Sequence, residues 1–173
     1  MRGGAISSII IDGYNLIGIH HTDLNSERNI LIGRLAEYRK LKGHDITVVF
    51  DGWKLGGHKD DAAVIAGIRV IYSRLGDKAD LVIKRTISSI KKEWIVITSD
   101  RDIMNHAWAE GSVPVSSQVF ESFLSRSSNN MAGDYELLPD EDDGDAAGKG
   151  NLKGNARRLS KKDKALKRVL QKL

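Results

Sequence analysis

Short apolar runs alternate along the chain with stretches in which apolar residues recur at helical spacing. The runs at 8–12, 46–51, 68–72 and 94–97 are rich in β-branched residues, which is typical of strands buried on both faces of a parallel sheet. Helical spacing predicts helices over 26–42, 79–91, 100–110 and 117–124, and Val113–Val115 is predicted as an edge strand because Pro114 lacks an amide donor. This alternation predicts an α/β fold with a mostly parallel central sheet.

Local signals set the expected ends of several elements. Asn25 or Ser26 can cap the helix over 26–42, and Gly43 can end it. The segment 52–61, rich in glycine and charge, is expected to be a loop.

The composition changes beyond residue 125. We expect one domain over 1–125, an acidic flexible linker over 126–150 and a basic amphipathic helix over 151–173. Seven acidic residues and no basic one lie between Asp134 and Asp145, whereas residues 149–173 hold ten Lys or Arg against one Asp. A basic terminal segment on a near-neutral body indicates a polyanionic partner, most often a nucleic acid.

The bulk composition narrows the class of protein. The 173 residues include no cysteine, which excludes a disulfide framework and a thiolate metal site. No signal peptide and no apolar run of membrane-spanning length is visible, so the sequence predicts a cytoplasmic protein without a membrane partner. The phosphate-binding loop of NTPases, the dinucleotide fingerprint and the Gly-x-Ser-x-Gly elbow are also absent from the sequence.

Acidic residues follow several of the predicted strands. Asp12, Asp51 and Asp100 each end a strand, and Asp80 begins a helix. Because the carboxyl ends of parallel strands share one edge of a sheet, these carboxylates should crowd together and require a cation. Oxygen ligands favour Mg²⁺ or Mn²⁺, which can support hydrolysis of a phosphodiester bond.

Each acid also has a purely structural explanation. Asp12 and Asp51 precede glycine and can form turns. Asp77 can cap the helix over 79–91, with Asp80 in its first turn, and Ser99 or Asp100 can cap the next helix. The shared position at one sheet edge favours the metal site over these separate explanations.

The acidic motifs resemble those of the NYN domains, relatives of the PIN nucleases, and most closely the bacterial YacP-like branch. The matching segments are, in order, Ile10-Ile11-Asp12-Gly13-Tyr14-Asn15, Val49-Phe50-Asp51-Gly52, Gly76-Asp77-Lys78-Ala79-Asp80 and Thr98-Ser99-Asp100. The resemblance covers residues 6–124 and implies a PIN-like, Rossmannoid three-layer fold with metal-dependent ribonuclease activity. Some members of the branch associate with ribosomes and cut mRNA there, which implies RNA, and the ribosome, as partners.

The resemblance also implies roles for individual residues. The catalytic residues that the resemblance implies are Asp12, Asn15, Asp80 and Asp100. The metal-binding acids that it implies are Asp12, Asp80, Asp100 and Asp102. Residues that support these ligands correspond to Asp51, Asp77 and Ser99. The C-terminal segment lies outside the matching motifs.

The C-terminal segment is predicted to bind RNA phosphates without regard to base sequence. The residues expected to do so are Arg157, Arg158, Lys161, Lys162, Lys164, Lys167 and Arg168. Trp53 is the preferred candidate for stacking on a base, ahead of Tyr14. Two other functions remain open at this point: a non-catalytic RNA- or ribosome-binding factor with the same fold, and a phosphatase acting on small nucleotides.

Overall fold

The structure, a computed structural model, describes residues 7–18, 23–52, 60–129 and 160–173. Its elements are β1 (Ser8–Asp12), α1 (Gly13–Ile17), α2 (Leu24–Lys42), β2 (Asp45–Phe50), β3 (Asp61–Ile65), β4 (Ile68–Tyr72), α3 (Ala79–Ser89), β5 (Trp94–Ile97), α4 (Arg101–Ala109), β6 (Val113–Val115), α5 (Ser117–Asn129) and α6 (Lys161–Leu170).

Six strands form one sheet in the order β3-β4-β2-β1-β5-β6. Only β3 runs antiparallel to its neighbour, so the sheet is mostly parallel, as the buried apolar runs predict. β6 lies at one edge, which confirms the prediction made from Pro114. β3 and the short helix α1 were not predicted. All five residues of β3 are exposed. Its sequence, Asp-Ala-Ala-Val-Ile, is a weak signal for a strand because it does not alternate apolar and polar residues and because alanine is depleted in strands.

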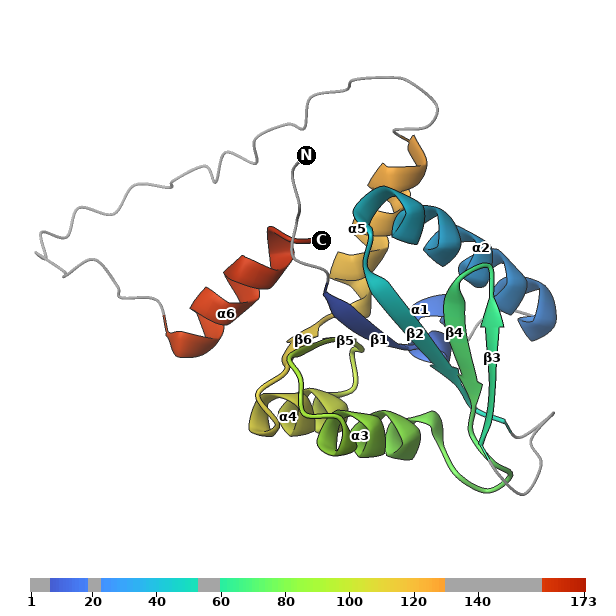
Figure 1. The fold of residues 1–173 in the computed structure, drawn as a ribbon, viewed down its shortest axis with the longest axis horizontal. Coiled ribbons are helices and arrows are strands. Elements are labelled where there is room, and N and C mark those ends of the chain that lie inside the picture. The colour runs from blue at the N-terminus through green and yellow to red at the C-terminus, as the bar shows by residue number, and fades with distance from the viewer. Residues whose placement is uncertain (1–6, 19–22, 53–59, 130–159) are drawn as a thin grey trace, which may run out of the picture.

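Helices cover both faces of this sheet (Figure 1). The first hydrophobic core joins α2 and α5 to one face and includes Leu35, Tyr38 and Phe120. The second core joins α3 and α4 to the opposite face and includes Ile83, Ile103 and Trp94. The result is the predicted three-layer α/β architecture, in which the helices cover the faces of the sheet.

The C-terminal helix α6 packs against the first of these cores. Val169 is fully buried and Leu173, just beyond the helix, is 2% exposed. The Tyr38 hydroxyl donates to the Leu173 carbonyl at 2.8 Å, and His44 Nε2 lies 3.0 Å from the Lys172 carbonyl oxygen. Burial raises the pKa of Tyr38 and lowers the pKa of His44. Both side chains therefore stay neutral while they hold the end of the chain against the domain.

The ends of α2 agree with local capping rules, with one correction. Asp23, and neither Asn25 nor Ser26, caps α2: its carboxylate accepts from the Asn25 amide at 3.1 Å and from the Ser26 amide at 3.2 Å. Gly43 ends α2 in the left-handed conformation, as predicted. Among the described residues, no helix is both long enough and apolar enough to cross a membrane.

Candidate active site

Four of the predicted site residues lie along the side of the sheet where the parallel strands end. Asp12 is the last residue of β1, Asp51 follows β2, Asp100 precedes α4 and Asp80 lies in the first turn of α3. We call this region, defined by these four residues, the aspartate edge. Asp51, Asp100 and Asp80 each raise the pKa of Asp12 through their charge, so the fold brings these three carboxylates within electrostatic range of Asp12.

Asp12 is the most strongly perturbed acid of the aspartate edge. Burial is the largest cause that raises its pKa, and the hydrogen bond from the Asn15 amide partly opposes it. The three neighbouring carboxylates raise the pKa further, to about 6. The charged form of Asp12 is therefore disfavoured in the metal-free protein, as expected for a carboxylate whose surroundings supply too little positive charge.

Backbone amides hold three of these carboxylates in place. Asp12 caps α1 by accepting from the Asn15 amide at 3.3 Å, and Asp100 caps α4 by accepting from the Asp102 amide at 2.7 Å. Asp51 accepts a hydrogen bond from the Ala79 amide at the start of α3. The expectation that Asp77 caps α3 is wrong: Lys78 occupies the N-cap position without a side-chain bond, and the Ala79 amide donates instead to Asp51, which follows β2.

Gly13, directly after Asp12, lies against the buried ring of Phe50. A Cβ atom on Gly13 would be 2.3 Å from Phe50 Cε1, far inside van der Waals contact. Because overpacking of this kind displaces neighbouring groups, Gly13→Ala should lower the free energy of unfolding by about 1–3 kcal/mol. Urea denaturation would measure the change.

Gly33→Ala is the matched control. Gly33 is exposed on α2 with no atom within 4 Å of the added Cβ, so alanine should raise the stability by about 0.5–1 kcal/mol. Equal effects of the two substitutions would contradict the close packing of Gly13 against Phe50.

Asn15 connects three segments behind the aspartate edge. Its Oδ1 accepts from the Ser99 amide at 2.8 Å and from the Ser117 hydroxyl at 2.5 Å. Ser99 Oγ in turn accepts from the Ser117 amide at 3.2 Å. These bonds fix the loop that carries Asp100 to the end of β1 and to the start of α5. Ser117 is a part of the site that the sequence did not reveal, because nothing local to it marks a functional serine.

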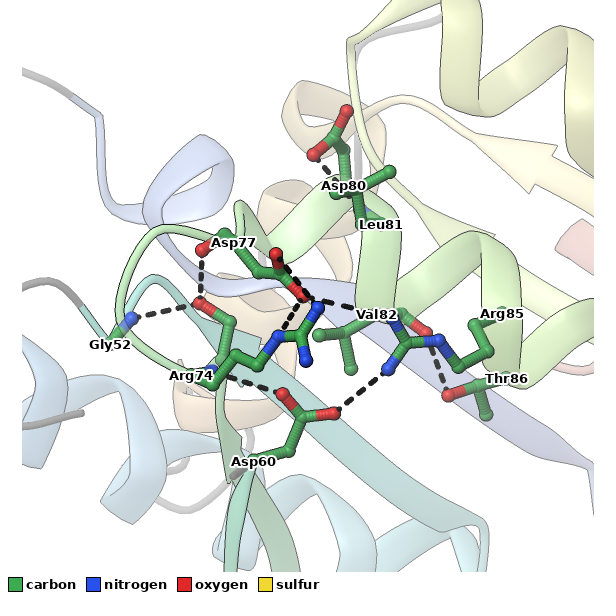
Figure 2. Close-up of polar contacts among 10 residues, drawn as sticks. Gly52, Asp60, Arg74, Asp77, Asp80, Leu81, Val82, Arg85 and Thr86 are labelled. Carbon is green, nitrogen blue, oxygen red and sulfur yellow. Dashed lines mark hydrogen bonds and ion pairs between the residues drawn. The ribbon is translucent and has the colours of Figure 1, made fainter. Parts of the chain in front are cut away.

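Asp77 lies apart from Asp80, in a separate network of ion pairs (Figure 2). It contacts Arg74 Nε at 2.7 Å and Arg85 at 3.7 Å, and Asp60 pairs with Arg85 at 3.2 Å. The fully buried Ser73 joins this network to the end of β2: its hydroxyl accepts from the Gly52 amide and donates to the Asp77 carbonyl. Asp77 thus stabilises the loop that leads into α3.

Asp102 is exposed and does not cap its helix. Its carboxylate accepts a hydrogen bond from Lys84 of α3, and this bond lowers the pKa of Asp102. Lys84 Nζ also lies 3.9 Å from Asp80. Lys84 therefore belongs to the site, although the sequence analysis did not select it.

The basic residues of α6 lie on the opposite side of the sheet from the aspartate edge, where the parallel strands begin. The helix and its C-terminal end contact residues that precede strands: Glu93 before β5 through Arg168, and His44 before β2 through Lys172. A five-residue strand spans about 17 Å, which sets the separation of the two edges. Lys161, Lys162, Lys164, Lys167 and Arg168 are exposed on this helix, whereas Arg157, Arg158 and Trp53 lie outside the described residues.

The aspartate edge fits a hard divalent cation in its chemistry. Its side-chain donors are carboxylate oxygens, which Mg²⁺ and Mn²⁺ prefer, and the raised pKa of Asp12 indicates a charge that a cation would stabilise. In the part of the chain that the structure describes, no three His, Cys, Asp or Glu side chains converge closely enough to hold a metal ion. The carboxylates instead accept hydrogen bonds from backbone amides and from Lys84.

Comparisons with known proteins agree with the fold. The model of the YacP-like NYN domain matches residues 9–167. YacP of Bacillus subtilis (strain 168) is 28% identical over an alignment of 102 residues, and the match covers 53% of this chain and 59% of YacP. The aligned part is thus less than two thirds of that relative's length.

Two solved structures resemble this fold. The crystal structure of Rae1 (YacP) from Bacillus subtilis has a TM-score of 0.60 and 23% identity, and the match covers 73% of this chain and 78% of that one. The crystal structure of a tryptophan-to-leucine mutant of Rae1 has a TM-score of 0.59 and 22% identity, covering 73% and 79%. The family match includes most of α6 in addition to the motifs of residues 6–124. On this match, the chain belongs to the family of YacP-like NYN domains, which have a nuclease-like fold.

Proposed function

We propose that this protein is a metal-dependent endoribonuclease that hydrolyses RNA phosphodiester bonds at the aspartate edge. The observation that carries the proposal is the position of Asp12, half-buried at the end of β1 and within range of the charges of Asp51, Asp80 and Asp100. Membership of a family with a nuclease-like fold supports the same chemistry. A site that served only to bind a polyanion would gain nothing from this concentration of negative charge.

Asp12, Asp80 and Asp100 would hold the divalent ion, Mg²⁺ or Mn²⁺. When bound, such an ion supplies activation of a water molecule and stabilisation of charge on the phosphate oxygens. Asn15 positions the loop of Asp100 through its bond to the Ser99 amide. The amino-terminal end of α4 adds a positive dipole close to Asp100, where a phosphate would approach.

RNA is the proposed partner, and α6 is the proposed second contact. Its exposed lysines and Arg168 would bind phosphates of the same strand at the opposite edge of the sheet. A bound RNA must then pass from one edge to the other, over a separation of about 17 Å. This arrangement suits a long RNA, including an mRNA presented by the ribosome, better than a short oligonucleotide. A cytoplasmic location is part of the same proposal.

The decisive experiment is cleavage of mixed cellular RNA by the full chain with Mn²⁺, Mg²⁺ or EDTA. Asp80→Asn and Asp100→Asn should each reduce the cleavage rate at least about 100-fold, because each removes a charged metal ligand. Asp45→Asn is a matched control, since Asp45 is an exposed acid at the start of β2, on the opposite edge. Cleavage that persists in EDTA, or that survives both substitutions, would contradict the proposal.

A non-catalytic RNA-binding factor is the second candidate. It is favoured by the absence of three converging carboxylates among residues 7–18, 23–52, 60–129 and 160–173. RNA binding without cleavage under any metal condition, repeated on translating ribosomes, would support this candidate. Hydrolysis of a phosphomonoester without cleavage of RNA would instead indicate a phosphatase.

A further inference from the structure

A cleft of about 510 Å³ opens where α6 packs against the domain, on the side of the sheet where the parallel strands begin. Helix α4 ends beside this cleft, and the edge strand β6 contacts both α4 and α6. The volume is in the range of ligand-binding sites, which is about 300–1,000 Å³. We call this feature the α6 cleft. Its lining includes an aromatic ring, two residues at the start of β6 and three basic side chains: Trp108, Ser112, Val113, Lys161, Lys162 and Arg168.

Trp108 provides the α6 cleft with a flat aromatic surface. It lies in the last turn of α4, is half-buried, and packs against the first hydrophobic core. The ammonium group of Lys162 lies over the face of the ring, 5.4 Å from its centre. Because Lys162 is exposed and its side chain is flexible, a planar group such as a nucleobase can replace it on this face.

The charge around the α6 cleft favours an anionic ligand. Glu93 is the single acid among the described residues that line it, against Lys161, Lys162 and Arg168. Glu93 pairs with Arg168 at 2.8 Å, so two exposed lysines remain for a ligand. An aromatic ring beside exposed cations is the combination that holds single-stranded nucleic acid, because the ring stacks on a base while the cations contact phosphates. A duplex hides the faces of its bases and could not use the ring.

Helix α4 connects the α6 cleft with the aspartate edge. Asp100 caps the start of the helix, and Trp108 follows about 12 Å further along its axis. Arg101, Asn105 and Trp108 are spaced by four and three residues, so they share one face of α4. Arg101 and Asn105 are both exposed. A single strand can therefore follow this face of α4 from the α6 cleft to the aspartate edge.

We propose that the α6 cleft binds one nucleobase of a single-stranded RNA, stacked on Trp108, with the flanking phosphates on Lys161 and Lys162. The identity of this ligand rests on the proposed function, but binding in the α6 cleft does not require cleavage at the aspartate edge. The site adds a contact to a base to the phosphate contacts of α6. It also gives the protein a preference for single-stranded over duplex RNA, which exposed lysines alone would not provide.

The test is the binding of a fluorescein-labelled single-stranded RNA of mixed sequence to the full chain, measured by fluorescence anisotropy in EDTA. Trp108→Leu should raise the Kd about 5- to 100-fold because the stacked base loses its platform, whereas Trp108→Phe should retain most of the affinity. Neither substitution should change the Kd for a duplex RNA of the same sequence. The single strand should also quench tryptophan fluorescence more in wild type than in Trp108→Phe.

Two further variants are the controls. Phe123→Leu should leave the Kd unchanged, because Phe123 is also half-buried against the first hydrophobic core but does not line the α6 cleft. Lys162→Gln should reduce the slope of log Kd against log salt concentration by about 0.7, since one phosphate contact is lost. Trp108→Leu should leave that slope unchanged, because stacking releases no counterions.

An unchanged affinity of Trp108→Leu for the single strand would overturn the proposal, as would an equal loss of affinity for single-stranded and duplex RNA. Displacement of the RNA by UMP or by a polyglutamate peptide at the same concentration would overturn it too, in favour of a free nucleotide or an acidic protein. Binding that depends on Trp108 without cleavage in any metal would reject the nuclease function and leave this site standing. Cleavage with binding that ignores Trp108 would reject this site alone.

Discussion

Replacing Asp12 with asparagine should stabilise the metal-free protein at pH 7 by about 1–3 kcal/mol, while RNA cleavage is lost. The folded protein raises the pKa of Asp12 from 3.8 to about 6, so it holds the charged form of this residue at a free-energy cost near neutral pH. An amide of the same shape removes that cost. Its oxygen can still accept from the Asn15 amide and cap α1.

The effect of Asp12→Asn should depend on pH in a defined direction. As pH falls through about 6, the folded wild-type protein binds a proton at Asp12 before the unfolded chain does. Wild type therefore regains stability relative to the variant, and the difference should disappear below about pH 4. Urea denaturation of both proteins at pH 7, 5 and 4 measures this.

Mn²⁺ provides the control for the functional part of this prediction. It should raise the Tm of wild type and leave the Tm of Asp12→Asn unchanged, because the variant lacks a charged ligand. A variant that is less stable than wild type at pH 7 in EDTA would show that Asp12 serves the fold more than the site.

Placing a charge at Val169 should unfold or strongly destabilise the domain. Val169 is fully buried between α6 and the first hydrophobic core, so Val169→Asp should lower the free energy of unfolding by about 3–5 kcal/mol. A reduced midpoint of urea denaturation, reported by Trp94 and Trp108 fluorescence, is the expected result. An unchanged midpoint would mean that α6 does not dock in solution.

Lys164→Asp is the surface control on the same helix. Lys164 is exposed, so this substitution should change stability by no more than about 0.5 kcal/mol. It should weaken RNA binding and reduce its dependence on salt concentration if α6 contacts phosphates. The two variants together separate the structural role of α6 from its proposed binding role.

The main strands were predictable because each is recognisable from a short segment of sequence. β1 and β5 occupy the residues predicted for them, since continuous β-branched and apolar runs suit strands that are covered on both faces. The parallel arrangement then places Asp12, Asp51 and Asp100 at one edge of the sheet. β3 was not predicted, because its short run of two alanines, one valine and one isoleucine neither alternates with polar residues nor is rich in strand-forming residues.

The sequence alone determined the α/β class and the order of the acidic motifs, because the first depends on local periodicity and the second is part of the sequence itself. Only the tertiary structure decided which side chains meet across the fold. It joined Lys84 to Asp102, Asp51 to the amide of Ala79, and Ser117 to Asn15. It also turned the apolar face of α6 toward the core and left the lysines of that helix exposed. An amphipathic helix has the same sequence pattern whether it packs on its own domain or on a partner, so the sequence could not decide the position of α6. Contacts between distant residues depend on how the helices and strands pack, so the sequence could not decide those contacts either.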